Sequence, residues 1–143
     1  MKEKRLRDKT WGDYGISKYR YRELQNFCLQ YDEKKQKIQY GISAMRPDAQ
    51  GGSSGGTSDP TSKRAMRHVG YLKDIQMIEL SAMETDKVLY PFLLKSVTKD
   101  LPYEAVEFDE MFGRIPYGKT DFYAYRRKFY SILDQKVDQT RYA

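Results

Sequence analysis

One segment near the C-terminus, residues 122–136, constrains the fold more than any other part of the chain. Its sequence, FYAYRRKFYSILDQK, combines five aromatic residues with three consecutive basic residues and contains neither proline nor glycine. Consecutive cations are costly to bury, and aromatic rings are mostly found out of water. We therefore expect an amphipathic helix whose two faces meet different surroundings, within an all-α fold.

This helix divides into an apolar arc and a polar arc. The positions at i, i+3, i+4 and i+7 spacing, which predict a core-facing stripe, are Phe122, Tyr125, Phe129, Ile132 and Leu133. The opposite arc carries Lys119, Thr120, Tyr123, Ala124, Arg127, Lys128 and Ser131, with Arg126 and Tyr130 on the flanks. Short polar and cationic side chains of this kind suit a groove lined by phosphates and base edges. A packed helix with a solvated basic face is the alternative.

The preceding residues predict the first half of a helix-turn-helix. Pro102 and Glu104 are typical of a first helical turn, and Gly113 is typical of a helix that ends in the left-handed conformation. Pro116 then favours the start of a new helix. A helix of about ten residues, a glycine-containing turn and a longer basic helix have the form of a helix-turn-helix, whose second helix enters the major groove.

The charges of these two halves differ. Residues 100–113 carry five acids and neither Lys nor Arg, whereas residues 114–143 carry seven Lys or Arg against three Asp. Basic residues confined to the second helix and the tail favour DNA binding by this unit.

Three further helices are predicted upstream. Residues 16–45 have an interrupted helical stripe typical of one long amphipathic helix, with Ser17 as its cap. Residues 59–83 have a wide apolar face, with Lys and Arg on the first turns. A third helix is expected within residues 84–100, with Pro91 near its start or at a kink.

The chain divides accordingly into four parts: a basic N-terminal arm and long helix (1–46), a Gly/Ser-rich flexible linker (47–59), a helical scaffold (60–99) and the helix-turn-helix DNA-binding unit (100–143). The linker contains the run GGSSGGTS, which forms neither helix nor strand readily. Residues 1–22 carry eight Lys or Arg against three acids. We expect them to form a disordered solubilising tail, with a phosphate-contacting arm as the alternative.

Composition narrows the class of protein. The 143 residues can bury one modest core or two small ones, and the net charge of +6 favours a polyanionic partner. The single Cys28 excludes an intramolecular disulfide and a cysteine metal cluster, and indicates a reducing compartment. No apolar run has the length of a membrane span or the character of a signal peptide, so we expect a cytoplasmic protein without membrane contact.

No group of residues predicts catalysis. His68 is the only histidine, has no acid or thiol at a telling spacing, and is expected at the surface or at an interface. The acids Glu104, Glu107, Asp109 and Glu110 could bind a divalent metal as in some nucleases, but this spacing is more typical of a solvated helix face. We therefore expect a protein that is not an enzyme and has no cofactor and no bound metal.

Four stretches together resemble a known family. They are KYRYRELQNFCLQY (18–31), GGTSDPTSKRAMR (55–67), LYPFLLKSVTKDLPYE (89–104) and IPYGKTDFYAYRRKFYSILDQK (115–136). The chain resembles, over nearly its whole length, the RinA/ArpU-type phage transcriptional activators, small prophage-encoded proteins of Gram-positive bacteria. The resemblance implies a bacterial host cell and a C-terminal part similar to the DNA-reading region 4 of sigma factors.

The most specific part of the resemblance is the pattern I-P-x-G-x-x-x-F-Y-x-x-R-R-x-F-Y-x-x-L-D. It is matched by Ile115, Pro116, Gly118, Phe122, Tyr123, Arg126, Arg127, Phe129, Tyr130, Leu133 and Asp134. The chain departs from the family in the segment EFDEMFGR, which lengthens the link before Ile115. This insertion bears on how the two helices cross.

We therefore expect a phage or prophage transcription regulator, an activator of late genes, that binds double-stranded promoter DNA through the helix at 117–137. The residues expected to face base edges are Lys119, Thr120, Tyr123 and Arg127. Those expected to contact phosphates are Arg114, Arg126 and Lys128. The acidic first helix or the N-terminal helices would touch host RNA polymerase.

Two other classes of protein remain open. A DNA-packaging protein similar to a small terminase subunit would also combine a helix-turn-helix with long helices, but as a ring of eight to ten subunits. A phage protein that binds and inhibits a host protein would use its basic face on an acidic partner. A homo-oligomer is compatible with each of these classes.

Overall fold

The computed structural model describes residues 3–44 and 60–142, so the linker expected at 47–59 lies outside the described residues. The fold is mostly helical, which confirms the expected all-α class, and it contains one two-stranded sheet. The elements in chain order are η1 (Leu6–Asp8), α1 (Lys18–Leu29), α2 (Tyr31–Ala44), α3 (Pro60–Thr85), α4 (Tyr90–Lys99), α5 (Tyr103–Val106), β1 (Phe108–Asp109), β2 (Gly113–Arg114) and α6 (Lys119–Tyr142).

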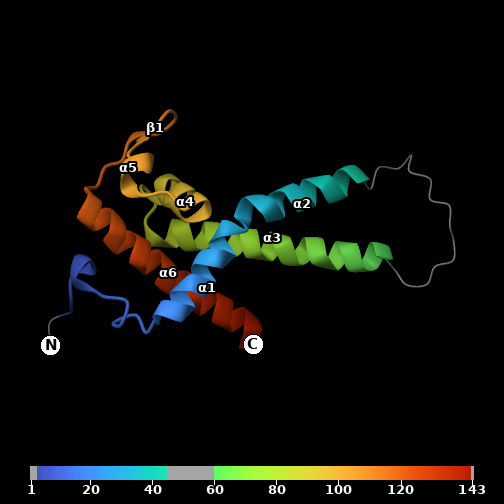
Figure 1. Cartoon of the computed structure of the whole chain (residues 1–143), viewed down its shortest axis with the longest axis horizontal. Helices are drawn as coiled ribbons and strands as arrows, with labels where there is room; N and C mark the ends of the chain where they lie inside the picture. Colours follow the sequence, from blue (N-terminus) through green and yellow to red (C-terminus); the bar gives the residue numbers. More distant parts are fainter. Residues whose placement is uncertain (1–2, 45–59, 143) are drawn as a thin grey trace.

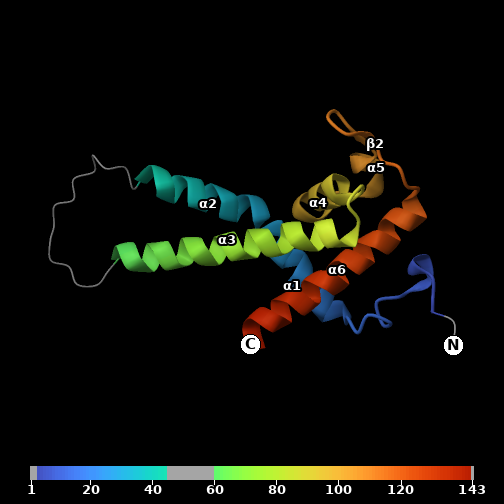
Figure 2. The ribbon, with the colours of Figure 1, turned by 180° about the vertical axis from the view of Figure 1, so that it is seen from behind.

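Two regions are visible in Figures 1 and 2. The arm consists of α2 and residues 60–74 of α3, which run side by side away from the remainder of the molecule. The body consists of the second half of α3 together with η1, α1, α4, α5, the β-hairpin and α6. The 26 residues of α3 therefore connect the two regions.

The long helix α6 forms the centre of the body, where it packs against α3, η1, α1 and α5. Its expected apolar arc is confirmed at Phe122, Phe129 and Leu133, which are fully buried. Two further residues are also buried, although they were expected outside this arc: Tyr130 and Ala124. The reason is that α6 is covered on more than one side.

The N-terminal segment, residues 3–17, supplies this additional cover. The Trp11 ring lies 4.6 Å from that of Tyr21 and 6.0 Å from that of Tyr130, between centroids. Ile16 is buried in the same core. The prediction of a disordered solubilising tail is therefore wrong for these residues, because their aromatic and aliphatic side chains complete the core around α6.

The single helix predicted over residues 16–45 is in fact two helices. Its N-cap is confirmed, since the Ser17 hydroxyl accepts a hydrogen bond of 3.1 Å from the amide of Arg20. The chain then changes direction between α1 and α2. Tyr31, at the start of α2, is buried and its hydroxyl donates to Glu79 of α3. The break arises because α1 packs on α4 and α6, whereas α2 packs on α3.

The next two helices agree with the sequence. Helix α3 begins at Pro60 and ends at Thr85, close to the predicted 59–83. Helix α4 has Pro91 in its first turn, as expected, and ends at Asp100, whose φ of 54° is left-handed. The side chain of Asp86 accepts a hydrogen bond of 2.8 Å from the amide of Leu89 and so orders the entry into α4.

The ten-residue helix predicted within residues 100–113 is wrong. Helix α5 has four residues and is followed by the β1–β2 hairpin, in which Phe108 pairs with Arg114. The Asp109 carboxylate accepts hydrogen bonds from the amides of Met111 and Phe112, at 2.7 and 3.0 Å. A side chain that binds nearby amides in this way stabilises a turn in place of a helix.

Gly113 does adopt the left-handed conformation, with a φ of 77°, but in this hairpin and not at a helix end. The helix-turn-helix predicted for residues 100–143 therefore lacks its expected first helix, and only its second helix is confirmed, as α6.

Candidate nucleic-acid interface

The seven residues expected to contact DNA do not share one open surface. Three of them are exposed near the start of α6: Arg114, Lys119 and Thr120. The Arg114 guanidinium lies 3.1 Å from the carboxylate of Glu107, and the Lys119 amine lies 2.6 Å from that of Glu104. The hydrogen bond from Lys119 lowers the pKa of Glu104, and the same bond raises the pKa of Lys119. Both cations are thus paired with carboxylates of the α5–hairpin segment.

Two other expected contacts, Tyr123 and Arg126, belong to the body. The Tyr123 hydroxyl accepts a hydrogen bond of 3.0 Å from the amide of Tyr103. The side chain of Arg126 is only 12% exposed, and its guanidinium lies 5.9 Å from the ring centroids of both Tyr123 and Tyr130. A guanidinium held over aromatic rings in this way stabilises the packing of α6.

Arg127 and Lys128 are also directed at the rest of the fold. The Arg127 guanidinium donates to the carbonyl oxygen of Lys9 at 3.0 Å, so it holds the N-terminal segment on α6. The Lys128 amine donates to the carbonyl oxygen of Thr85 at 3.3 Å, at the C-terminus of α3. Cations at a helix C-terminus interact favourably with its terminal carbonyl groups. These two side chains therefore have structural partners in the described chain.

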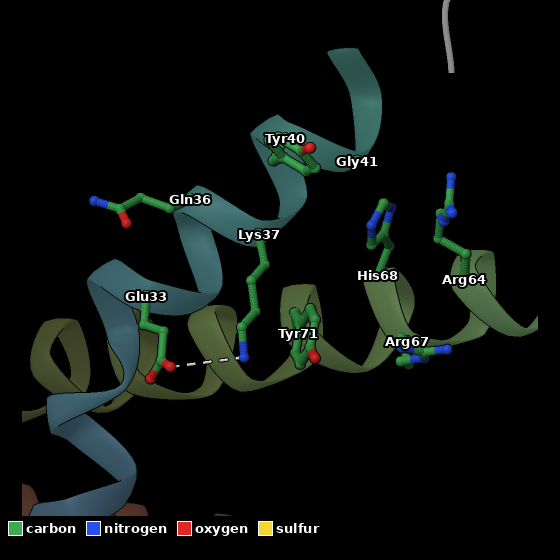
Figure 3. Close-up of a pocket in the computed structure, with 9 residues that line it drawn as sticks. All are labelled: Glu33, Gln36, Lys37, Tyr40, Gly41, Arg64, Arg67, His68 and Tyr71. Carbon is green, nitrogen blue, oxygen red and sulfur yellow. Dashed lines mark ion pairs between the residues drawn. The ribbon is translucent and has the colours of Figure 1, made fainter. Parts of the chain in front are cut away.

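A different surface gathers exposed cations. A pocket of about 740 Å³, which we call the arm pocket, opens between α2 and α3 (Figure 3). Its lining residues are Glu33, Gln36, Lys37, Tyr40 and Gly41 from α2 and Arg64, Arg67, His68 and Tyr71 from α3. The basic residues of α3 lie on its first turns, where Arg64 and Arg67 are exposed. Two separate helices therefore contribute to one site.

The charge of the arm pocket is positive. Lys37, Arg64 and Arg67 stand against a single acid among its lining residues, Glu33, and that carboxylate is 3.6 Å from the Lys37 amine. Within residues 3–44 and 60–142, no ion pair engages Arg64 or Arg67. Without a competing carboxylate in this part of the chain, their guanidinium groups can bind an anion in a bidentate way.

A glycine sets the distance between the two helices of the arm. A β-carbon at Gly41 would overlap the ring of His68, which is half-buried and points from α3 toward α2 (Figure 3). The expectation that His68 lies at a surface or an interface is therefore confirmed. Glycine within a helical pattern often marks a close approach of this kind. Gly41 within α2 is therefore a sequence signal of a close approach between two helices.

Two tyrosines complete the arm pocket. Tyr40 is 78% exposed, and the ring of Tyr71 has the Lys37 amine 5.5 Å from its centroid. Exposed aromatic rings stack on unpaired bases, whereas toward a duplex the guanidinium and ammonium groups are the elements that bind phosphates. Sequence reasoning noted the basic first turns of α3 but missed the site, because its two halves are separated by residues 45–59.

Two other kinds of site have no support in the described part of the chain. It contains no group of three or more His, Cys, Asp or Glu side chains that could hold a metal ion. Of the four acids considered for a metal site, Glu104 is paired with Lys119 and Glu107 with Arg114. Among the described helices, none combines the length and the apolar character needed to cross a membrane.

Comparison with known proteins adds no relative. No protein-family model matches the chain, and neither a curated protein nor a solved structure is significantly similar to it.

Proposed function

We propose that the protein binds double-stranded DNA as a phage-type transcription regulator and that the arm pocket is its principal phosphate-binding surface. The observation that carries this proposal is the convergence of Lys37, Arg64 and Arg67 with two tyrosines in one open pocket. DNA binding depends chiefly on cations that can replace the counterions of phosphate groups. Arg64 and Arg67 meet this requirement without first losing a partner in the described chain.

The start of α6 is a secondary contact in this proposal. To bind phosphates, Lys119 would have to leave Glu104 and Arg114 would have to leave Glu107. Each lost ion pair reduces the net binding free energy that the phosphate contact contributes. Thr120 is exposed and, among the described residues, has no such competitor, so it remains a candidate for a base contact. The acids of the α5–hairpin segment are the surface that would face host RNA polymerase.

The test is fluorescence anisotropy of the full chain with duplexes tiled across the DNA that flanks its own gene, at two salt concentrations. One duplex next to a promoter should bind tightly and in a salt-dependent way. Replacing both Arg64 and Arg67 with Ala should weaken this binding at least tenfold. It should also make the slope of log K against log salt less steep by about 2, roughly one for each phosphate contact removed.

The matched control replaces Lys18 and Lys87 with Ala. Both lysines are exposed and lie outside the arm pocket. Their replacement removes the same total charge as replacement of the two arginines. Equal loss of affinity in the two double variants would overturn the role of the arm pocket, since only the net charge would then matter. Weak binding that is uniform over all duplexes would overturn the proposal of a sequence-specific regulator.

A further inference from the structure

Helix α3 carries a stripe of apolar side chains that the described chain leaves largely exposed to solvent. Its members are Met66, Val69, Leu72, Leu80 and Met83, with exposed fractions of 71, 53, 45, 49 and 43%. The same helix buries Ile75, Ile78 and Ala82 on another face. A helix that is apolar on one face packs against one neighbour, and a second apolar face calls for a second neighbour.

Four members of the stripe, Met66, Val69, Leu80 and Met83, form a helix-pairing seam together with the polar residues Lys73 and Gln76, and Leu72 lies beside this seam. Positions 66, 69, 73, 76, 80 and 83 follow one another at intervals of 3, 4, 3, 4 and 3 residues. Intervals that alternate between three and four residues are those of the a and d positions of a coiled coil. The stripe therefore fits another long helix laid nearly along α3.

The residues of the seam are also arranged symmetrically about its midpoint, between positions 74 and 75. When the helix is read from its C-terminal end, Met66 takes the place of Met83, Val69 that of Leu80, and Lys73 that of Gln76. Apolar positions thus match apolar ones, and the central polar positions match each other. A surface that is complementary to its own reverse is the requirement of an interface with two-fold symmetry.

We propose that two copies of this chain pair through α3 in antiparallel orientation, with positions 66, 69, 73, 76, 80 and 83 as the seam. The Lys73 amine would then lie beside the partner's Gln76, whose side-chain oxygen can accept its hydrogen bond. A polar pair at the centre of an apolar seam fixes the register of the two helices. The seam and the arm pocket use different residues of α3, so pairing leaves Arg64 and Arg67 accessible.

A groove between the seam and α6 shares three residues with the seam and agrees with this register. It has a volume of about 320 Å³ and is lined by Lys73, Gln76, Met77 and Leu80 of α3 and by Lys136, Gln139 and Thr140 of α6. In the antiparallel pair, the partner's Val69 comes opposite Leu80 at this groove. The groove thus offers space for a side chain that is about half exposed in the single chain.

The test is the mass of the full chain in solution, measured without DNA by light scattering coupled to size exclusion, so that it is independent of the proposed function. We expect twice the chain mass of 16.9 kDa. Replacing Val69 and Leu80 with Glu should give a monomer with unchanged helical circular dichroism. The control replaces Val88 and Met111, which are exposed elsewhere, with Glu and should remain a dimer.

Cysteine cross-linking tests the orientation. Because Cys28 is buried, the introduced cysteines are the accessible ones. The double variant Val69→Cys, Leu80→Cys should form a covalent dimer under mild oxidation, whereas Val69→Cys alone should not. A monomer of the native chain, a dimer that survives the Glu substitutions, or cross-linking by Val69→Cys alone would each overturn the proposal. A ring of eight to ten subunits would also overturn it and would favour the DNA-packaging class.

Discussion

The arm and the body use their basic residues in opposite ways. In the body, the most basic stretch of the sequence, residues 126–128, is turned toward the protein, where Arg127 binds a carbonyl oxygen and Arg126 lies among tyrosine rings. In the arm, Arg64 and Arg67 are exposed at a pocket with a single, already paired acid. A run of cations in a sequence thus does not locate an anion-binding surface until the neighbouring chain segments are known.

Replacing Arg127 with Ala is expected to show the largest difference between the body and the arm, as a change in the free energy of unfolding. It should lower the free energy of unfolding by about 2 kcal/mol, because the carbonyl oxygen of Lys9 loses a charged donor. Affinity of the folded variant for DNA should change less than twofold. Urea unfolding followed by circular dichroism, together with the anisotropy measurement, checks both parts.

Arg64→Ala is the matched control for this variant. It should change the free energy of unfolding by less than about 0.5 kcal/mol, since Arg64 is exposed, yet it should weaken DNA binding. The comparison fails if Arg127→Ala leaves stability unchanged and abolishes DNA binding, because α6 would then be the reading surface after all.

A smaller effect is expected at the contact that closes the arm. Gly41→Ala should destabilise the protein by about 1 kcal/mol, because the new methyl group overlaps the His68 ring and forces the two helices apart. The same substitution in a His68→Ala background should instead stabilise it by up to about 1 kcal/mol, since alanine is the better helix former. Thermal unfolding of the four proteins of this double-mutant cycle is the measurement, and additive effects would refute the contact.

The smallest effect concerns the N-terminal segment of the body at low pH. The backbone amide of Thr10 and the amine of Lys4 bind the Asp13 carboxylate and lower its pKa from the usual 3.8. As the pH falls, the Asp13 carboxylate is protonated in the unfolded chain before it is protonated in the folded chain. Its contribution to the free energy of unfolding is therefore present above pH 3.8 and is lost as the pH falls further. Asp13→Asn should flatten this part of the pH profile measured by urea unfolding. An identical profile would exclude the contribution.

Local signals in the sequence predicted several features correctly. Ser17 as a cap, Pro91 in a first turn and the extent of α3 each depend on a few neighbouring residues, and the structure has all three. The apolar arc of α6 was predicted for the same reason, because helical spacing alone identifies a core stripe.

Features that depend on distant contacts were not predicted. The break before Tyr31 follows from the different packing partners of α1 and α2, with Tyr31 bonded to Glu79 of α3. The short α5 follows from the turn that Asp109 stabilises. The arm pocket combines Lys37 with Arg64 and Arg67 across residues 45–59, so no spacing within one segment reveals it. Six of the seven expected DNA contacts lie on α6 and were predicted without the N-terminal segment that covers this helix.

The contact between the N-terminal segment and α6 has a consequence for how the protein is made. The contact between Arg127 and Lys9 joins residues that are 118 positions apart in the chain. The contact between Trp11 and Tyr130 has a similar separation. Contacts of such wide separation form slowly, because a long loop must close first. During synthesis the helices of the arm can pair early, whereas the core of the body is complete only after residues 119–142 have left the ribosome. Until then, Trp11 and Ile16 remain exposed on the nascent chain and are natural binding sites for a chaperone.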